Sequence, residues 1–206
     1  MKCYNIAFFA SHNGSNMQSI IEQIKAGILC SKAALIISNN SNSGAAEKAG
    51  RYGIPFYHIS SKTHLDENER TAFISELYDE FDISLTVLAG YMKKFPPELI
   101  RKANGMVLNI HPALLPKFGG EGMFGMNVHK AVIQSGEQFS GATVHLVDSE
   151  YDRGRILLQE SLEVSPDDTP ESLARRVLEI EHRIYPALIK MLELESIKIP
   201  MPVSTV

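Results

Sequence analysis

The feature that most constrains this chain is the alternation of short, largely apolar runs with amphipathic stretches. Five such runs lie in its first half and are predicted strands: residues 6–10, 33–37, 56–59, 85–89 and 106–110. Between them, apolar side chains at helical spacing predict helices at 17–24, 45–51 and 65–81. Strands that are apolar along their whole length are buried on both faces. The pattern therefore predicts an α/β fold, with a mostly parallel, twisted sheet covered by helices on both faces.

The second half of the chain changes character. We predict a helix at 128–134, two strands at 142–147 and 156–164 joined by a polar turn, and one long helix at 170–194. The two strands are expected to extend the same sheet as an antiparallel pair. A length of 206 residues, at about 150 residues per domain, indicates one domain. We place it at residues 1–198, followed by a tail at 199–206.

Charge and apolar length argue against two classes of partner. The 20 basic and 24 acidic side chains leave a net charge of −4, whereas a domain that binds a nucleic-acid backbone usually carries a basic excess. The longest apolar stretches, 33–37 and 85–92, are far shorter than the roughly 18 residues of a membrane-spanning helix. We expect no nucleic-acid and no membrane partner. We also expect a cytoplasmic location, because the apolar stretch at 3–10 is too short for a signal peptide.

The sequence carries no signature of a bound metal or nicotinamide. Its histidines form no metal-ligand spacing, and neither a G-x-G-x-x-G segment nor a Walker loop is present. Cys3 and Cys30 match no metal spacing and are too few for a disulfide framework. We therefore expect both cysteines to be reduced, buried thiols in a reducing compartment.

Polar segments follow three of the predicted strands, at 11–16, 89–92 and 109–112. The carboxyl ends of parallel strands meet at one edge of a sheet, where ligands bind in open α/β folds. In the first segment, the free amides of residues 13–16 at a helix N-terminus are suited to a phosphate. The alternative interpretation of this segment is helix capping by Ser15 or Asn16.

Asn109 and His111 lie two residues apart and thus on the same side of an extended strand end. An amide beside an imidazole can stabilise an oxyanion while the imidazole moves a proton. The alternative is a structural histidine before Pro112. The turn at 148–154 offers three carboxylates that can orient such an imidazole, and the spacing does not choose among them. Its alternative interpretation is a solvated hairpin loop.

Five widely spaced segments resemble, in order, the phosphoribosylglycinamide formyltransferases, the folate-dependent enzymes of de novo purine synthesis. They are residues 13–16, 88–92, 109–117, 141–145 followed by Asp152, and 181–186. The resemblance implies a single Rossmann-like formyltransferase domain. It also implies transfer of a formyl group from 10-formyltetrahydrofolate, a consumed co-substrate, to the glycine amine of glycinamide ribonucleotide, without metal or nicotinamide. We expect a monomer or a homodimer.

The resemblance assigns roles to particular residues. Asn109, His111 and Asp152 match the catalytic trio of the family, in which the amide and a charged imidazole stabilise the oxyanion and the aspartate keeps the imidazole protonated. The ribonucleotide and its phosphate are implied on Asn13, Gly14, Ser15, Asn16 and Glu181. The implied folate-binding residues are Arg70, Tyr91, Met92, Lys93, Lys94, Phe95, Asn109, Ser140, Gly141, Ala142 and Val144.

Two features depart from the family pattern. His12 stands where the family often has glycine, which affects how closely the turn wraps a phosphate. Residues 118–125 form a segment a few residues longer than the commonest version, with four glycines. That segment predicts either a mobile lid beside the site or a tolerated surface insertion.

Three other functions are weighed against this one. A formyltransferase acting on initiator methionyl-tRNA would carry a further C-terminal domain, and a formyltetrahydrofolate hydrolase a further N-terminal domain; we expect neither here. A non-catalytic nucleotide-binding module would have no reason to bring Asn109, His111 and Asp152 together.

Overall fold

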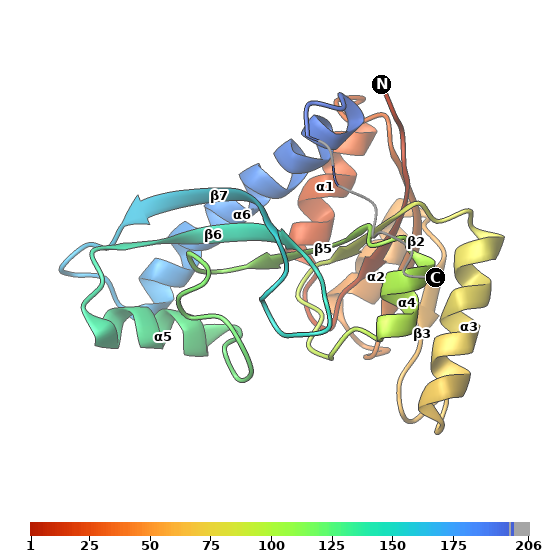
Figure 1. Ribbon diagram of the computed structural model, residues 1–206, viewed down its shortest axis with the longest axis horizontal. Helices are drawn as coiled ribbons and strands as arrows, with labels where there is room; N and C mark the ends of the chain where they lie inside the picture. Colours follow the sequence, from red (N-terminus) through yellow and green to blue (C-terminus); the bar gives the residue numbers. More distant parts are fainter. Residues whose placement is uncertain (198, 200–206) are drawn as a thin grey trace, which may run out of the picture.

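The computed structural model describes residues 1–197 and 199 and contains one seven-stranded sheet with helices on both faces (Figure 1). The strands are β1 (Asn5–Phe9), β2 (Lys32–Ser38), β3 (Phe56–His58), β4 (Leu85–Leu88), β5 (Val107–His111), β6 (Phe139–Leu146) and β7 (Ile156–Glu163). The helices are α1 (Ser15–Lys25), α2 (Gly44–Tyr52), α3 (Glu67–Glu80), α4 (Pro97–Lys102), α5 (Met126–Ser135) and α6 (Pro170–Glu193). The tail predicted at 199–206 lies outside the described residues, except for Ile199.

The sheet has the strand order β3-β2-β1-β4-β5-β6-β7. Strands β1 to β5 are parallel, whereas β6 runs antiparallel to both β5 and β7. The predicted α/β class, with its antiparallel C-terminal extension, is confirmed. The chain reverses its winding direction between β1 and β4, and such a switch point is where open α/β sheets bind ligands.

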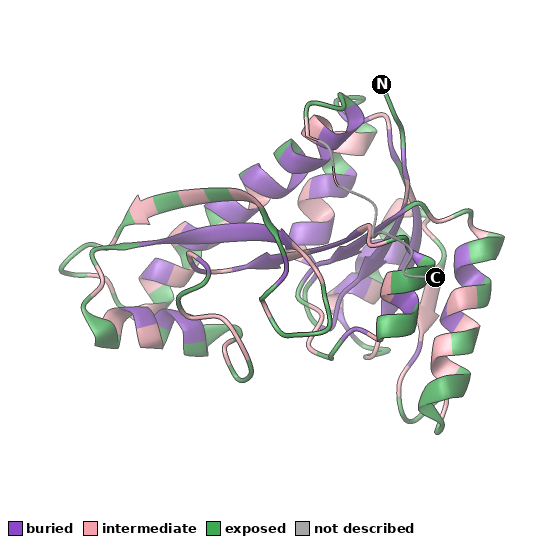
Figure 2. Ribbon diagram, in the orientation of Figure 1, coloured by how far each residue is buried: buried purple, intermediate pink, exposed green. Residues whose placement is uncertain are grey.

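Two hydrophobic cores cover the two faces of the sheet. The first packs α1, α2, α5 and α6 against the strands, and the second packs α3 and α4. Figure 2 shows the central strands as buried, while exposed positions concentrate on the outer helix faces and the loops. The edge strand β7 mixes exposed and half-buried residues instead. Among the described residues, no helix is long and apolar enough to span a membrane.

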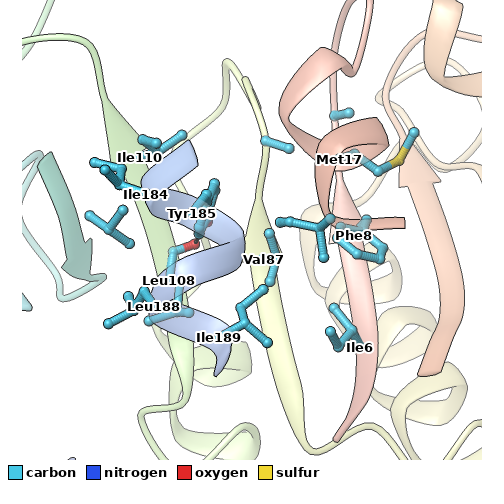
Figure 3. Close-up of a cluster of buried hydrophobic side chains, with 14 of the residues drawn as sticks. Ile6, Phe8, Met17, Val87, Leu108, Ile110, Ile184, Tyr185, Leu188 and Ile189 are labelled. Carbon is cyan, nitrogen blue, oxygen red and sulfur yellow. Dashed lines mark hydrogen bonds between the residues drawn. The ribbon is translucent and has the colours of Figure 1, made fainter. Parts of the chain in front are cut away.

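Helix α6 packs against two of the strands that carry the site. Tyr185 and Leu188 face Leu108 of β5 (Figure 3). The buried Tyr185 hydroxyl donates to the Leu88 carbonyl at 3.1 Å and to the Leu108 carbonyl at 3.0 Å. Because a buried hydroxyl requires a partner, this contact anchors the helix to the carboxyl end of β4 and to the first half of β5.

The expectation of two reduced, buried cysteines is wrong. Cys3 and Cys30 form a disulfide, with their Cα atoms 5.3 Å apart. The register of β1 on β2 pairs Asn5 with Lys32, so the residues two positions earlier on each chain segment also lie side by side. Cys3 is exposed and Cys30 is half-buried. The spacing of the two cysteines along the sequence does not reveal the bond, because the parallel pairing of β1 with β2 is what brings them together.

Candidate functional site

The three polar segments predicted to form a site meet at the switch point between β1 and β4. The Ser11 amide donates to the Gly90 carbonyl at 3.1 Å, and the Ser11 hydroxyl accepts from the Met92 amide at 2.9 Å. The end of β5, with Asn109 and His111, lies beside β4. Together these segments line a cavity of about 590 Å³. Their predicted convergence is confirmed.

The turn before α1 presents backbone amides at this cavity. Gly14 has φ +67° and is the N-cap of α1, without a side-chain cap. The alternative interpretation, capping by Ser15 or Asn16, is therefore wrong. The N–H groups of a first helical turn lack intrahelical partners and attract anions. Behind the turn, the Ala45 amide of α2 donates to the His12 carbonyl at 3.2 Å.

Glu181 of α6 lines the cavity beside this turn. Its Oε2 accepts from Asn16 Nδ2 at 2.5 Å, and each of the two residues is only 8% exposed. Burial raises the pKa of Glu181 to about 7, although the hydrogen bond from Asn16 acts in the opposite direction. Asn16 Oδ1 is buried without a partner among the described residues. The pair thus combines an unused acceptor with a carboxyl group that titrates near neutral pH.

Asn109 of β5 lies opposite His145 of β6 in the sheet register. Asn109 Nδ2 is 3.1 Å from His145 Nε2. His145 Nδ1 is 2.7 Å from the Leu146 carbonyl, and a carbonyl only accepts, so Nδ1 carries the proton and Nε2 is the acceptor. This bond uses one N–H of the Asn109 amide. The other N–H remains for a ligand in the cavity.

His111 is 3% exposed, and its two ring nitrogens have different neighbours. Nε2 lies 2.7 Å from the Phe118 carbonyl and therefore carries the proton. Nδ1 faces Asp152 Oδ2 at 3.5 Å. Burial lowers the pKa of His111, while Asp152 and the Phe118 carbonyl act in the opposite direction. The imidazole is thus neutral at neutral pH, and its Nδ1 can accept a proton beside a carboxylate.

Among the three carboxylates of the 148–154 turn, the structure places Asp152 at the imidazole, whereas Asp148 and Glu150 are exposed. Asp152 Oδ2 also accepts from the Gly120 amide at 2.9 Å, and its Oδ1 lies 3.5 Å from His145 Nε2. Burial by itself would raise the pKa of Asp152, but its neighbours together lower it below the usual value. Asp152 therefore stays ionised.

The glycine-rich segment 118–125 belongs to the site. Its Phe118 carbonyl and Gly120 amide make the two contacts just described, and much of it lines the cavity. A Cβ on Gly119 would lie 2.5 Å from Leu115 Cδ2 and 3.1 Å from Asp152 Cβ, so glycine lets the segment pack closely beside Asp152. The segment thus contributes directly to the site, and its two interpretations, as a mobile lid or as a tolerated insertion, stay predictions.

Part of the predicted folate-binding set lies around two cavities that share Tyr91. Met92 lines the cavity described above. Lys93, Lys94 and Arg70 line a second cavity of about 500 Å³. With Lys62, this second cavity combines the Tyr91 ring with four lysine or arginine side chains, a composition suited to an aromatic ligand that carries carboxylates.

The rest of that set is buried in the fold. Phe95 packs edge-on against Phe9, with ring centroids 5.1 Å apart. Four predicted residues lie buried within β6 and line neither of the two cavities: Ser140, Gly141, Ala142 and Val144. A Cβ on Gly141 would lie 2.0 Å from the Glu160 carbonyl oxygen, so glycine is needed there for strand packing.

Sequence reasoning assigned no role to two residues that support the site. His145 orients Asn109, as described above. Thr143 lies opposite His111 in the β5–β6 register, and its hydroxyl donates to the Ala113 carbonyl at 2.6 Å. The signal that would have found both is the antiparallel register, which places alternate residues of β6 beside Asn109 and His111.

Comparisons with known proteins identify the family. Residues 4–189 match the family model described as Formyl transferase. The chain is 42% identical over 187 residues to the chloroplastic phosphoribosylglycinamide formyltransferase of Vigna unguiculata; the match covers 91% of this chain but 60% of that protein, so the chain spans less than two thirds of that relative. It is 35% identical over 185 residues to the phosphoribosylglycinamide formyltransferase of Haemophilus influenzae, with 90% and 85% covered. The crystal structure of glycinamide ribonucleotide transformylase 1 from Symbiobacterium toebii matches with a TM-score of 0.88 at 30% identity, covering 96% of this chain and 91% of that one. The chain therefore belongs to the formyl transferase family, among the phosphoribosylglycinamide formyltransferases.

Proposed function

We propose that this protein transfers the formyl group of 10-formyltetrahydrofolate to the glycine amine of glycinamide ribonucleotide, giving formylglycinamide ribonucleotide and tetrahydrofolate. The observation that carries the proposal is the grouping of the Asn109 amide, His111 Nδ1 and the Asp152 carboxylate on one wall of a cavity. The turn at 13–16, with amides suited to a phosphate, lines the same cavity. A phosphorylated amine bound on that turn shares its cavity with the groups that the chemistry needs.

The reaction requires a hydrogen-bond donor for a developing oxyanion and a group that moves one proton. When the amine nitrogen attacks the formyl carbon, a C–N bond forms and the formyl oxygen gains negative charge. The Asn109 N–H that does not bind His145 donates to that oxygen. His111 Nδ1 takes a proton from the attacking amine. The proton then passes to N10 of the folate as the bond between the formyl carbon and N10 breaks, and tetrahydrofolate leaves.

This order of events refines the expected role of Asp152. Because burial lowers the pKa of His111, the imidazole starts neutral and acts as a base, rather than being charged throughout. Once it has taken the proton, Asp152 stabilises the imidazolium across a gap of 3.5 Å. The charge appears when the oxyanion appears, which is when it lowers the barrier most.

We propose that the folate lies along residues 91–95, with Arg70, Lys93 and Lys94 near its carboxylates. Folate contacts from residues 140–144 remain a prediction, as do the monomeric or homodimeric state and the cytoplasmic location. No metal or nicotinamide has a part in the proposed reaction. In the part of the chain that the structure describes, no group of three or more His, Cys, Asp or Glu side chains is arranged to hold a metal ion.

The test measures release of tetrahydrofolate from 10-formyltetrahydrofolate by the purified protein, with and without glycinamide ribonucleotide. We expect release in proportion to the ribonucleotide added. His111→Ala should lose about a thousandfold in rate, within the usual contribution of a general base. His182→Ala, a histidine of α6 that does not line the cavity, is the control and should keep its rate. Release that ignored the ribonucleotide would contradict the proposal and indicate a hydrolase.

A further inference from the structure

Lys48 is a buried cation that the proposed chemistry does not use. It lies in the middle of α2 and is 9% exposed. Its Nζ donates to the backbone carbonyl and to the side-chain Oδ1 of Asn13, each at 2.8 Å. Among the described residues, no carboxylate lies within 4.0 Å of this nitrogen. An ammonium group taken out of water without an anionic partner is costly. Its position therefore indicates an anion that the protein itself does not supply.

Among the described residues, no lysine or arginine lines the cavity beside Asn13, and Lys48 itself lies behind the turn. The described residues that line it include His12, His111 and His129, but neither of these two basic residue types. A phosphate monoester carries between one and two negative charges at neutral pH. The backbone amides of the turn contribute only partial charges. Lys48 donates to the backbone carbonyl and the side-chain oxygen of Asn13, and so places a full positive charge next to this turn.

The N-terminus of α2 is shaped to hold the turn closely. A Cβ on Gly44 would lie 2.7 Å from Asn13 Oδ1 and 3.0 Å from its carbonyl oxygen, so α2 approaches Asn13 to within backbone contact. The Ala45 amide binds the neighbouring His12 carbonyl, and Lys48 reaches Asn13 from one helical turn further along. Asn13 is thus fixed through its backbone and its side chain by a single helix.

We propose that Lys48 is a positioning residue for the phosphate of the substrate. Through Asn13 it orients the amides of residues 14–16 toward the cavity, and its buried charge supplies the positive potential that a phosphate monoester needs. The inference rests on the proposed function for the identity of the substrate. Since Lys48 touches neither reacting atoms nor folate-binding residues, it should govern ribonucleotide affinity and leave the chemical step unchanged.

The experiment compares two ligands that differ only in the phosphate: glycinamide ribonucleotide and the corresponding glycinamide ribonucleoside. Their affinities are measured for the wild type, Lys48→Met, Lys48→Gln and Lys32→Met. We expect Lys48→Met to weaken binding of the ribonucleotide by at least about tenfold, because one charge near an anion is lost. Binding of the ribonucleoside should weaken by less than about twofold. Lys48→Gln keeps a donor for Asn13 but loses the charge, and should show the same selective loss. Lys32→Met removes one charge from an exposed lysine of β2 and should change neither affinity.

The affinity for folate and the value of kcat should be unchanged in both Lys48 variants, which also establishes that they are folded. Equal weakening of the two ligands in Lys48→Met would overturn the inference, because Lys48 would then act only on the structure of the turn. If the wild type failed to transfer the formyl group, the proposed function would be contradicted. The binding comparison would still decide the role of Lys48, since it detects phosphate preference without catalysis. A wild type that showed no such preference would overturn that role as well.

Discussion

Replacing Asp152 with asparagine removes one charge from the site and keeps the shape of the side chain. Asp152 Oδ2 lies 3.5 Å from His111 Nδ1, and the two side chains are 11% and 4% exposed. At an effective dielectric constant of about 20, two unit charges at this separation attract each other by about 5 kcal/mol. The imidazole becomes charged only when it takes the proton, so most of this attraction acts in the transition state. We therefore expect kcat to fall about a thousandfold, equivalent to about 4 kcal/mol.

The pH profile separates this effect from general damage. Burial lowers the pKa of His111 and Asp152 raises it, so in Asp152→Asn the pKa of His111 should fall further. The acid limb of kcat/KM, measured by tetrahydrofolate release, should then move to lower pH while the maximal rate drops. Asp148→Asn is the matched control, because this exposed residue lies in the same turn and its bond from the Glu150 amide survives the change. A loss below about tenfold, or an acid limb that stays or moves to higher pH, would refute the reasoning.

Three further predictions concern stability and the support of the site. Because burial raises the pKa of Glu181 from 4.5 to about 7, the folded protein binds one more proton than the unfolded chain between these pH values. The free energy of unfolding should therefore fall by up to about 3 kcal/mol as the pH rises from 4.5 to about 7. In urea titrations, Glu181→Gln should lose this dependence of stability on pH. His145→Phe removes the acceptor that orients Asn109, so kcat should fall by about ten- to a hundredfold, with no further loss when it is combined with Asn109→Ala; additive losses would contradict the pairing. Cys30→Ser opens a crosslink between residues 27 apart and should lower the free energy of unfolding by about 3 kcal/mol without changing kcat. Thiol titration of the unreduced wild type should find no free thiol in the native or the unfolded protein.

Much of the fold follows from local patterns in the chain. The run predicted as a strand at 6–10 is β1 at Asn5–Phe9, and the long helix predicted at 170–194 is α6 at Pro170–Glu193. Both are strong signals, because a short apolar run and a long amphipathic helix leave few ways to bury their apolar side chains. The predicted ends of the strands differ by a residue or more from those in the structure, because hydrogen-bond pairing rather than composition sets where a strand stops.

The sequence predicts only the part of the candidate site that follows from one rule: open α/β sheets bind ligands at the carboxyl ends of their parallel strands. That rule brings the turn at 13–16 together with Asn109 and His111, because the turn follows β1 and the two side chains lie at the carboxyl end of β5, at one edge of the sheet. It does not identify Asp152 as the nearest carboxylate, since that depends on the path of the 148–154 turn. It does not reveal Lys48 either, because the contact joins a helix interior to the turn that follows a different strand.

The fate of the formyl group tests the central claim most directly. The protein is incubated with 10-formyltetrahydrofolate labelled with ¹³C at the formyl carbon and with glycinamide ribonucleotide, and the products are followed by NMR. The account predicts that the label appears in the amide of formylglycinamide ribonucleotide, one equivalent for each tetrahydrofolate released. Label that appeared as free formate, at a rate independent of the ribonucleotide, would contradict it.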